Sequence, residues 1–403
     1  LLILNVGKLP NAWITPCRLV ALNFSQSCIF PADMSKRVGI NTRLLIPHKL
    51  DGIGRFTLEI VQRLVLLCPD TEFHLFFDRN PPSLNWPDNV KCHRVWPPAR
   101  RTYLFDWWFN RSLPRQFRKH KIDLFFSPDG YCSLSTNVPQ VSVIHDLNFE
   151  HHPEWLPPKI ASYLKDRFPK FADKSSEVIT VSEYSKDDIV SLYGVPKEQV
   201  HVVYNAPSKS FFEVENDQQE EIRKEYGQER PYFLYVGTFH PRKNMEGLVR
   251  AFQNYVDQGG GMDLVLVGES LWGNDPWMTQ IPSEVQDRIH LKGRLAQSDL
   301  TKITAAATCL CYVPFFEGFG LPIVEAFQAG VPVIASNTTS IPEVVEDAGL
   351  LVDPRDENQI AGAMIRLEND DILREELIEK GKKRAKEFDW DVSARKVKEI
   401  LGL

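Results

Sequence analysis

The strongest constraint on the fold is an alternation of short apolar runs with amphipathic stretches, which begins at Arg37 and continues to the C-terminus. In the segment FTLEIVQRLVLL (56–67), for example, Ile60, Leu64 and Leu67 fall on one helical face. Strands that alternate with helices predict a mostly parallel sheet covered by helices on both faces. The runs expected to be strands are RVGIN (37–41), FHLFFD (73–78), DLFFS (123–127), VSVIH (141–145), EVITV (177–181), HVVYN (201–205), PYFLYVG (231–237), MDLVLVG (262–268), RIHLKG (288–293), TCLCYVP (308–314) and VPVIAS (331–336).

A polar segment divides this alternation into two halves. The chain has 403 residues, which is too long for one ordinary core. Residues 207–230 offer few side chains to bury in a sheet, so we expect the interdomain connection there. The sequence therefore predicts two doubly wound, Rossmann-like α/β domains that face each other across a cleft. The expected divisions are an extension without function (1–33), an N-terminal domain (34–206), the connection (207–230), a C-terminal domain (231–385) and a final helix returning to the N-terminal domain (386–403).

Composition excludes several classes of protein. The net charge of −6 gives no reason to expect nucleic acid as a partner. Seven scattered cysteines without a Cys-x-x-Cys pair indicate free thiols in a reducing compartment, and Cys309 and Cys311 read as part of a buried strand rather than a metal site. No apolar run is long enough to cross a bilayer. We expect a cytoplasmic enzyme.

The most informative turn lies in YVPFFEGFGLPIVEAFQAGVPVIAS (312–336). An apolar strand is followed by a glycine-rich turn, and Pro322 stands where a helix begins, a position that tolerates its missing N–H. The amides of Gly320 and Leu321 at this helix N-terminus would attract an anion, and a diphosphate fits that description. In sheets of this kind ligands bind beyond the carboxyl ends of the strands, where this turn lies.

Two glutamates border the same predicted pocket. Glu317 lies in the turn and Glu325 about one turn into the helix. Carboxylates repel a diphosphate but accept hydrogen bonds from hydroxyls, so we assign Glu325 to a ribose and Glu317 to the donor sugar. The structural alternative is that both are ordinary solvated charges, and for either residue alone that alternative is the better one.

A basic pair stands before a second helix, in LYVGTFHPRKNMEGLVRAF (234–252). Arg242 and Lys243 oppose the dipole of a helix expected to start near Asn244, which is unfavourable unless an anion is present. We interpret them as ligands of a diphosphate that stabilise it as it leaves. The alternative is a solvated basic pair.

The sequence E-GFGLP-x-x-E, an E-x7-E pattern, resembles the motif of retaining glycosyltransferases of family 4, and the PRKN loop resembles that family's diphosphate-binding loop. The resemblance covers roughly Arg37 to the C-terminus and implies the two-domain GT-B fold. One departure is Thr238, where many relatives have arginine after the strand glycine, and Asn205-Ala206 replaces a frequent Asn-Gly. Further matching segments are DGIGRF (51–56), VSVIHDL (141–147), VITVSEYSKDDI (178–189) and SIPEVVEDAGLLVDP (340–354).

The resemblance also implies roles for individual residues. Gly52 and Gly54 would form a loop touching the donor phosphates, His145 would reach the donor sugar, and the turn KGRL (292–295) would pass close to the nucleobase. From the residues alone, His145 is equally well a hydrogen-bonded core histidine or, with Asp146, part of a capping pair. The residues expected to act in catalysis are Glu317, His145, Lys243 and Arg242, and those expected to bind the donor are Gly52, Gly54, Arg242, Lys243, Gly318, Phe319, Gly320, Leu321, Glu325, Arg294 and Leu295.

The predicted activity is transfer of a hexose, with retention, from a nucleotide diphosphate-sugar to a glycan or lipid-linked hydroxyl, without a cofactor or metal. GIGRF and HPRKN favour GDP-mannose and a bacterial polysaccharide or lipid-linked acceptor. Asp389-Trp390-Asp391 resembles the metal motif of another glycosyltransferase fold by chance: we expect Trp390 to anchor the final helix and Asp391 to be an N-terminal charge.

Three other functions were weighed. A nicotinamide-dependent oxidoreductase is disfavoured because no G-x-G-x-x-G follows the first strand. A nucleotide-sugar epimerase of the same fold and a non-catalytic subunit of a glycan assembly complex remain alternatives.

A further expectation concerns the membrane. The segment 99–121 mixes aromatic and basic residues and is a candidate for peripheral contact with an anionic membrane. The alternative places Leu104, Trp107, Trp108 and Leu113 in the core of the N-terminal domain.

Overall fold

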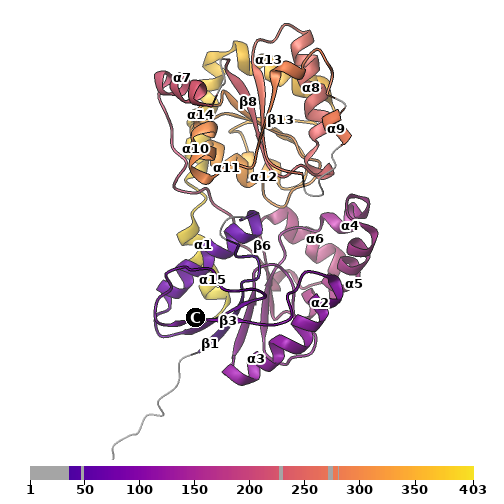
Figure 1. The fold of residues 1–403 in the computed structure, drawn as a ribbon, viewed down its shortest axis with the longest axis vertical. Coiled ribbons are helices and arrows are strands. Elements are labelled where there is room, and N and C mark those ends of the chain that lie inside the picture. The colour runs from indigo at the N-terminus through magenta and orange to yellow at the C-terminus, as the bar shows by residue number, and fades with distance from the viewer. Residues whose placement is uncertain (1–35, 47–49, 227–229, 271–275, 280) are drawn as a thin grey trace, which may run out of the picture. The chain divides into compact units, whose positions relative to one another are not determined.

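The computed structural model describes residues 36–46, 50–226, 230–270, 276–279 and 281–403. Within this part of the chain, two parallel sheets with flanking helices make up the protein (Figure 1). The expected extension at 1–33 lies outside the described residues.

The first sheet has seven parallel strands in the order β3-β2-β1-β4-β5-β6-β7. Its central strands are buried on both faces, as expected for a sheet covered on both sides. The strands are β1 (Arg37–Asn41), β2 (Glu72–Phe77), β3 (Val90–Arg94), β4 (Leu124–Ser127), β5 (Gln140–Val143), β6 (Glu177–Thr180) and β7 (Val200–Val202). The helices are α1 (Gly52–Leu67), α2 (Thr102–Trp107), the π-helix η1 (Trp108–Ser112), α3 (Leu113–His120), α4 (Asn148–His151), α5 (Pro158–Lys174) and α6 (Glu183–Tyr193), with short 3₁₀ turns η2 (Pro153–Trp155) and η3 (Lys197–Gln199).

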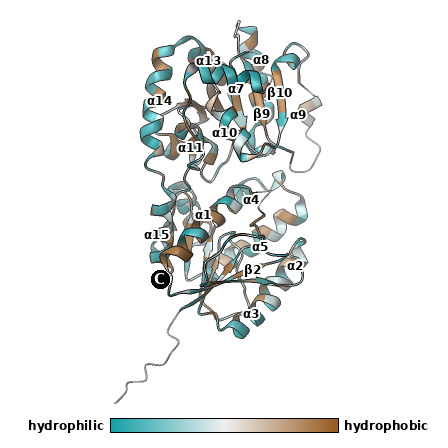
Figure 2. Cartoon of the chain, turned by 60° about the vertical axis from the view of Figure 1, so that its left-hand side comes forward, coloured by the Kyte–Doolittle hydropathy of each residue, from teal (hydrophilic) through white to brown (hydrophobic). Residues whose placement is uncertain are grey.

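The second sheet has six parallel strands in the order β10-β9-β8-β11-β12-β13. Figure 2 shows apolar residues along the strands and a largely hydrophilic α14. The strands are β8 (Tyr232–Val236), β9 (Asp263–Val267), β10 (Ile289–Gly293), β11 (Cys309–Tyr312), β12 (Val333–Ser336) and β13 (Leu350–Val352). The helices are α7 (Asn216–Glu225), α8 (Met245–Asp257), α9 (Pro276–Thr279), α10 (Gln297–Ala305), α11 (Leu321–Gln328), α12 (Ile341–Val345), α13 (Glu357–Asn369), α14 (Asp371–Ala385) and α15 (Trp390–Ile400), with the 3₁₀ turns η4 (Pro241–Lys243) and η5 (Gln286–Arg288).

Local signals set several of these boundaries. α6 begins at Ser182, whose side chain accepts from the amide of Ser185, and ends at Gly194 in the left-handed conformation. The last helix begins at Asp389, which accepts from the amides of Asp391 and Val392. All strands expected from the sequence are present, including the fully buried β11 with Cys309 and Cys311.

The C-terminal helix α15 packs against α1 of the first sheet (Figure 1). Trp390 is buried and its ring meets that of Phe56 edge to face, which fits the expected anchor. Asp391 pairs with Arg63 of α1 at 2.5 Å. The chain therefore crosses back from the second sheet to the first after α14.

Sequence analysis did not predict two of the strands. β3 is an edge strand of mostly exposed or half-exposed polar residues, VKCHR, and β13 is only three residues long. The polar stretch assigned to the connection contains helix α7.

A larger correction concerns Gly52 and Gly54, which were expected in a loop. They form the first turn of α1, because Asp51 caps that helix by accepting from the amide of Gly54 at 2.7 Å.

Candidate functional site

Two strand-to-helix turns meet at the carboxyl edge of the second sheet. One follows β8 and contains η4, and the other follows β11 and leads into α11. The amide of Phe315 donates to the carbonyl of Arg242 at 2.8 Å, so the two turns are joined backbone to backbone. Asn244, buried and in the left-handed conformation, donates to the carbonyls of Val313 (3.1 Å) and Pro354 (2.6 Å). Sequence analysis used Asn244 only as the start of a helix, although asparagine is among the few residues that adopt this conformation readily.

Both cations of the PRKN turn meet one carboxylate oxygen. Oε1 of Glu317 accepts from Nη1 of Arg242 at 2.7 Å and from the hydroxyl of Tyr312 at 2.8 Å, and Nζ of Lys243 also contacts it. Lys243 donates to the Tyr312 hydroxyl at 2.5 Å, and both Lys243 and Glu317 are 7% exposed. Burial and the nearby guanidinium of Arg242 lower the pKa of Lys243, while contact with Glu317 favours its charged form.

This arrangement changes one expectation. Sequence analysis assigned Glu317 to sugar hydroxyls and the two cations to a diphosphate, whereas in the structure the cations and the carboxylate bind one another. The backbone of Glu317 is also fixed, because its amide donates to Thr339 at 3.1 Å and its carbonyl accepts from Ser340 at 2.9 Å. Sequence analysis missed Tyr312, which ends β11 and holds the pair together.

The first turn of α11 presents backbone donors. Gly320 caps the helix with φ of 96°, a conformation that favours glycine, and Pro322 lies in the first turn. The described residues provide no acceptor for the amides of Gly320 and Leu321. The side chain of Phe319 is buried, and its ring meets that of Phe388 edge to face. A ligand at this turn would therefore meet backbone rather than the Phe319 ring.

Glu325 is a buried carboxylate that has no hydrogen-bond partner among the described residues. It is 6% exposed, and burial raises its pKa to about 7, with Arg55 of α1 acting in the opposite direction. A buried carboxylate without partners costs free energy unless a ligand supplies donors. Its position one turn into α11 matches the place predicted from the sequence.

The first sheet contributes His145, just after β5, and it approaches the glycine-rich turn closely. A Cβ atom added to Gly318 would lie 2.2 Å from the carbonyl oxygen of His145, so only glycine fits there. Nε2 of His145 donates to the carbonyl of Pro128 at 2.8 Å, which leaves Nδ1 as the acceptor in the neutral ring. Burial lowers the pKa of His145, and Asp146 binds the amide of Asn148 at 3.0 Å. The hydrogen bond to Pro128 fits the first structural alternative, although His145 is half-buried rather than part of the core. The second is met only in part, because Asp146 binds the amide of Asn148 but the N-cap of α4 is Leu147, which makes no side-chain cap.

Two arginines form hydrogen bonds between the region around the start of α1 and the half of the chain that contains the second sheet. Arg55 donates to Gln297 at 2.6 Å, and Arg294, an exposed residue of the KGRL turn, donates to the carbonyl of Leu50 at 3.1 Å. Leu295 beside it packs against the main core. A Cβ on Gly54 would be crowded by the carbonyl of Leu44 at 3.0 Å, whereas a Cβ on Gly52 meets nothing within 4 Å. Sequence analysis missed Arg55, although it lies inside the quoted DGIGRF segment.

Glu343 of α12 makes a further contact that the sequence did not reveal. Its carboxylate accepts from the backbone amides of Glu183 (2.8 Å) and Tyr184 (3.2 Å) and from the hydroxyl of Tyr204 at 2.9 Å. It therefore caps α6, a helix of the first sheet, from a helix of the second. The only signal was its place in the SIPEVVED segment.

The two carboxylates of the Asp-Trp-Asp sequence stabilise the C-terminal helix and its packing. Asp389 caps α15 and Asp391 binds Arg63, so both carboxylates have partners within the fold.

The segment 99–121 is divided between core and surface. Trp108 and Leu113 are buried, Leu104 is half-buried, and Trp107 is 47% exposed, so the core alternative holds for only part of the set. Among the described helices, none is long and apolar enough to span a membrane.

Comparison with known proteins identifies the family. Residues 50–207 match the family described as Glycosyltransferase Family 4, and residues 217–384 match the family described as Glycosyl transferases group 1. O-antigen chain mannosyltransferase B of Escherichia coli is 31% identical over 360 residues, which are 86% of this chain and 94% of that protein. The chain is a family 4 glycosyltransferase.

Solved structures support the fold of this glycosyltransferase. Sucrose-phosphate synthase from Thermosynechococcus elongatus superposes with a TM-score of 0.72 at 20% identity, covering 91% of this chain and 98% of that one. HepE from Anabaena, solved with UDP-glucose, gives 0.71 at 18% identity, covering 91% and 99%. The predicted GT-B fold with two Rossmann-like domains is confirmed.

Proposed function

We propose that this glycosyltransferase transfers a hexose, with retention of anomeric configuration, from a nucleotide diphosphate-sugar to a hydroxyl of a glycan or lipid-linked acceptor. The observation that carries the proposal is Glu325: a buried carboxylate without a partner, one helical turn from backbone amides that also lack acceptors. A ribose diol supplies two donors for that carboxylate, and a diphosphate supplies acceptors for those amides. One nucleotide diphosphate satisfies both requirements.

The cluster of Arg242, Lys243 and Glu317 would bind the rest of the donor. Arg242 and Lys243 carry two positive charges that face one carboxylate oxygen in the ligand-free protein. An incoming diphosphate would compete for these cations, and Glu317 would then be released to accept from a sugar hydroxyl. Glu317 offsets part of the positive charge of half-buried Arg242 and buried Lys243, and its contacts hold both side chains in place.

We propose the following reaction for these residues. The acceptor oxygen attacks the anomeric carbon on the face from which the diphosphate leaves. The bond between carbon and phosphate oxygen breaks, and that oxygen takes the acceptor proton. Arg242, Lys243 and the α11 amides stabilise the charge that develops on the diphosphate, and removing one such contact would raise the barrier by about 3 kcal/mol. His145, beside Gly318, would border the sugar with Nδ1 available as an acceptor.

No metal ion or other cofactor is required in this scheme, because two cationic side chains and backbone amides take the place of one at the leaving group. We propose GDP-mannose as the donor and a bacterial polysaccharide or its lipid-linked precursor as the acceptor. The E. coli relative is described as an O-antigen chain mannosyltransferase, which supports mannose and this acceptor class.

We also propose peripheral contact with an anionic membrane through the exposed side of α2, η1 and α3. Tyr103 and Trp107 are 62% and 47% exposed there, and the guanidinium of Arg111 lies 5.3 Å from the Trp107 ring centre. Exposed basic residues on the same elements would meet acidic headgroups. Flotation with anionic vesicles at low salt tests this contact, and absence of binding would remove it.

The function is tested by incubating the protein with GDP-mannose and UDP-glucose in parallel, with and without glycan and lipid-linked acceptors. Transfer from GDP-mannose, with an α-linked product detected by NMR, is expected. Inversion at the anomeric carbon would contradict the mechanism. Epimerisation of the donor without an acceptor, or no turnover with any nucleotide-sugar that stabilises the protein, would contradict the assignment itself.

A further inference from the structure

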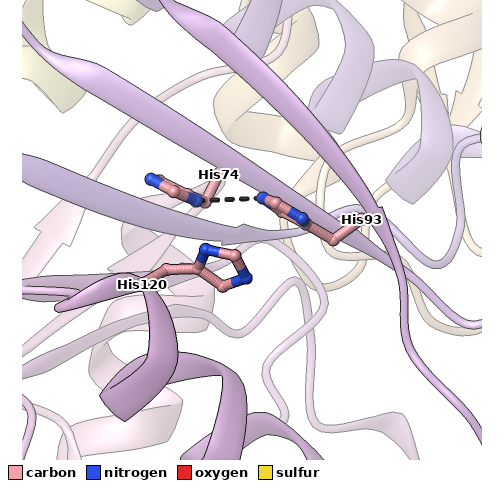
Figure 3. Close-up of side chains that lie close together, drawn as sticks. All are labelled: His74, His93 and His120. Carbon is pink, nitrogen blue, oxygen red and sulfur yellow. Dashed lines mark hydrogen bonds between the residues drawn. The ribbon is translucent and has the colours of Figure 1, made fainter.

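Three histidines far apart in the sequence converge on one face of the first sheet. His74 lies on β2, His93 on β3 and His120 at the last position of α3 (Figure 3). In the parallel register Phe76 pairs with His93, so His74, two residues before Phe76, points to the same face as His93. α3 covers that face, as the contact between the rings of Phe76 and Phe117 at 5.9 Å shows.

The ring nitrogens are close enough to share one ion. Nδ1 of His74 and Nε2 of His93 are 2.9 Å apart, and one nitrogen from each of the three rings lies within 4.8 Å of the other two. A tetrahedral zinc ion with bonds of about 2.0–2.1 Å requires ligand nitrogens roughly 3.3 Å apart. The separations in the structure, 2.9 Å for one pair and up to 4.8 Å within the set, are close to that spacing, and the rings would rotate to reach it.

The hydrogen bonds around the cluster favour metal binding. Nε2 of His74 donates to the carboxylate of Glu72 at 2.6 Å, which leaves Nδ1 with a lone pair directed at the cluster. A carboxylate behind a metal-binding histidine is a recurrent arrangement that fixes the tautomer. Nε2 of His120 is buried and has no hydrogen-bond partner, which is costly for a ring nitrogen without a ligand.

The charge state of the rings also suits a cation. Burial lowers the pKa of all three histidines, that of His93 to about 4, so the rings are neutral and their lone pairs are available near neutral pH. Two lysines lie nearby: Lys91 is bound to Glu72 at 2.6 Å, and the charge of Lys119 acts on the rings. The negative charge of Glu72 partly offsets the positive charges of these two lysines.

We propose that His74, His93 and His120 form a binding site for a divalent transition metal ion, with zinc as the expected occupant and water as its fourth ligand. Three imidazoles select borderline ions such as Zn²⁺ over Mg²⁺ or Ca²⁺. On binding, His93 would move its proton from Nε2 to Nδ1. The ion would tie the edge strand β3 and helix α3 to β2. The residues proposed for sugar transfer lie on other elements, so this site has a structural role.

The test is metal binding by the full chain after dialysis against a chelator. We expect one Zn²⁺ per chain by calorimetry, a visible absorption spectrum of tetrahedral Co²⁺, and a rise in melting temperature with either ion. His93→Ala and His120→Ala should each weaken binding at least tenfold and abolish the Co²⁺ spectrum, and Glu72→Gln should weaken binding about tenfold to 100-fold while all three ligands remain.

The matched control is His201→Gln, a histidine of β7 that pairs with Glu177 at 2.7 Å outside the cluster. It should bind zinc like the unmodified protein. Circular dichroism of each variant without metal reports whether it folds, and Glu72→Gln provides a second route if a histidine variant does not. Zinc binding that is absent in the unmodified chain, or that is equally weakened by His201→Gln, would overturn the proposal.

Discussion

Replacing Glu325 by glutamine should stabilise the ligand-free protein while it weakens donor binding. Burial raises the pKa of this carboxyl from 4.5 to about 7. At roughly 1.4 kcal/mol per pKa unit, this difference amounts to about 3 kcal/mol. Glu325 as a residue is 6% exposed, so solvent screens little of this effect.

The sign of the pH dependence follows from the same values. In the unfolded chain Glu325 ionises near pH 4.5, but in the folded protein it ionises near pH 7. Folding therefore carries no cost from this group below pH 4.5, an increasing cost between these values, and the full cost above pH 7. The free energy of unfolding of Glu325→Gln should exceed that of the unmodified protein by about 3 kcal/mol at pH 8 and by no more than about 1 kcal/mol at pH 5.

Urea denaturation at pH 5 and pH 8 measures both values, with Glu220→Gln on exposed α7 as the control that should change neither. Calorimetry with GDP should show affinity lost by about tenfold to 100-fold, because each hydrogen bond to a charged group contributes about 1.5–3 kcal/mol. A Glu325→Gln protein that is less stable than the unmodified protein at pH 8, or whose free energy of unfolding rises equally at both pH values, would refute the reasoning. Unchanged GDP affinity would remove Glu325 from the donor site.

Three other predictions concern the same site. Lys243→Ala should lower turnover by orders of magnitude and leave the fold intact, since Glu317 keeps Arg242. Glu317→Gln should lower turnover as much, and it should also lower the free energy of unfolding because buried Lys243 loses its carboxylate partner. Near-normal turnover in either variant rejects its role. Gly318→Ala should reduce kcat sharply, because its methyl group would force the turn away from the His145 carbonyl; unchanged kcat would show that the turn adapts. EDTA should leave turnover unchanged well below the melting temperature, and activity that is lost and then restored by Mn²⁺ would contradict the metal-independent mechanism.

The sequence predicted what depends on local pattern. Apolar runs identified the buried strands, and glycine and proline identified the turn before α11, because these signals come from neighbouring residues. β3 was missed because an edge strand needs no continuous apolar run, and VKCHR has none. Gly52 and Gly54 were placed in a loop because the resemblance implied one, although Asp51 directly before them is a residue type that caps helices.

The side-chain partners of the site could not be predicted in the same way. Glu317, Arg242 and Lys243 were identified individually, but their mutual contact depends on how two turns about 75 residues apart in sequence meet at the sheet edge. The three histidines lie on separate elements with no metal-binding spacing between them. Only the register of β2 with β3 and the packing of α3 bring them together.

The contact of Glu343 with α6 has a consequence for dissecting the enzyme. A recombinant fragment that stops at residue 206 would retain Ser182 but lose the carboxylate that binds the amides of Glu183 and Tyr184. Water would have to hydrate both groups, and the first turn of α6 would fray. Amide exchange of these two residues in such a truncated protein would therefore report directly how strongly one half of the transferase completes the other.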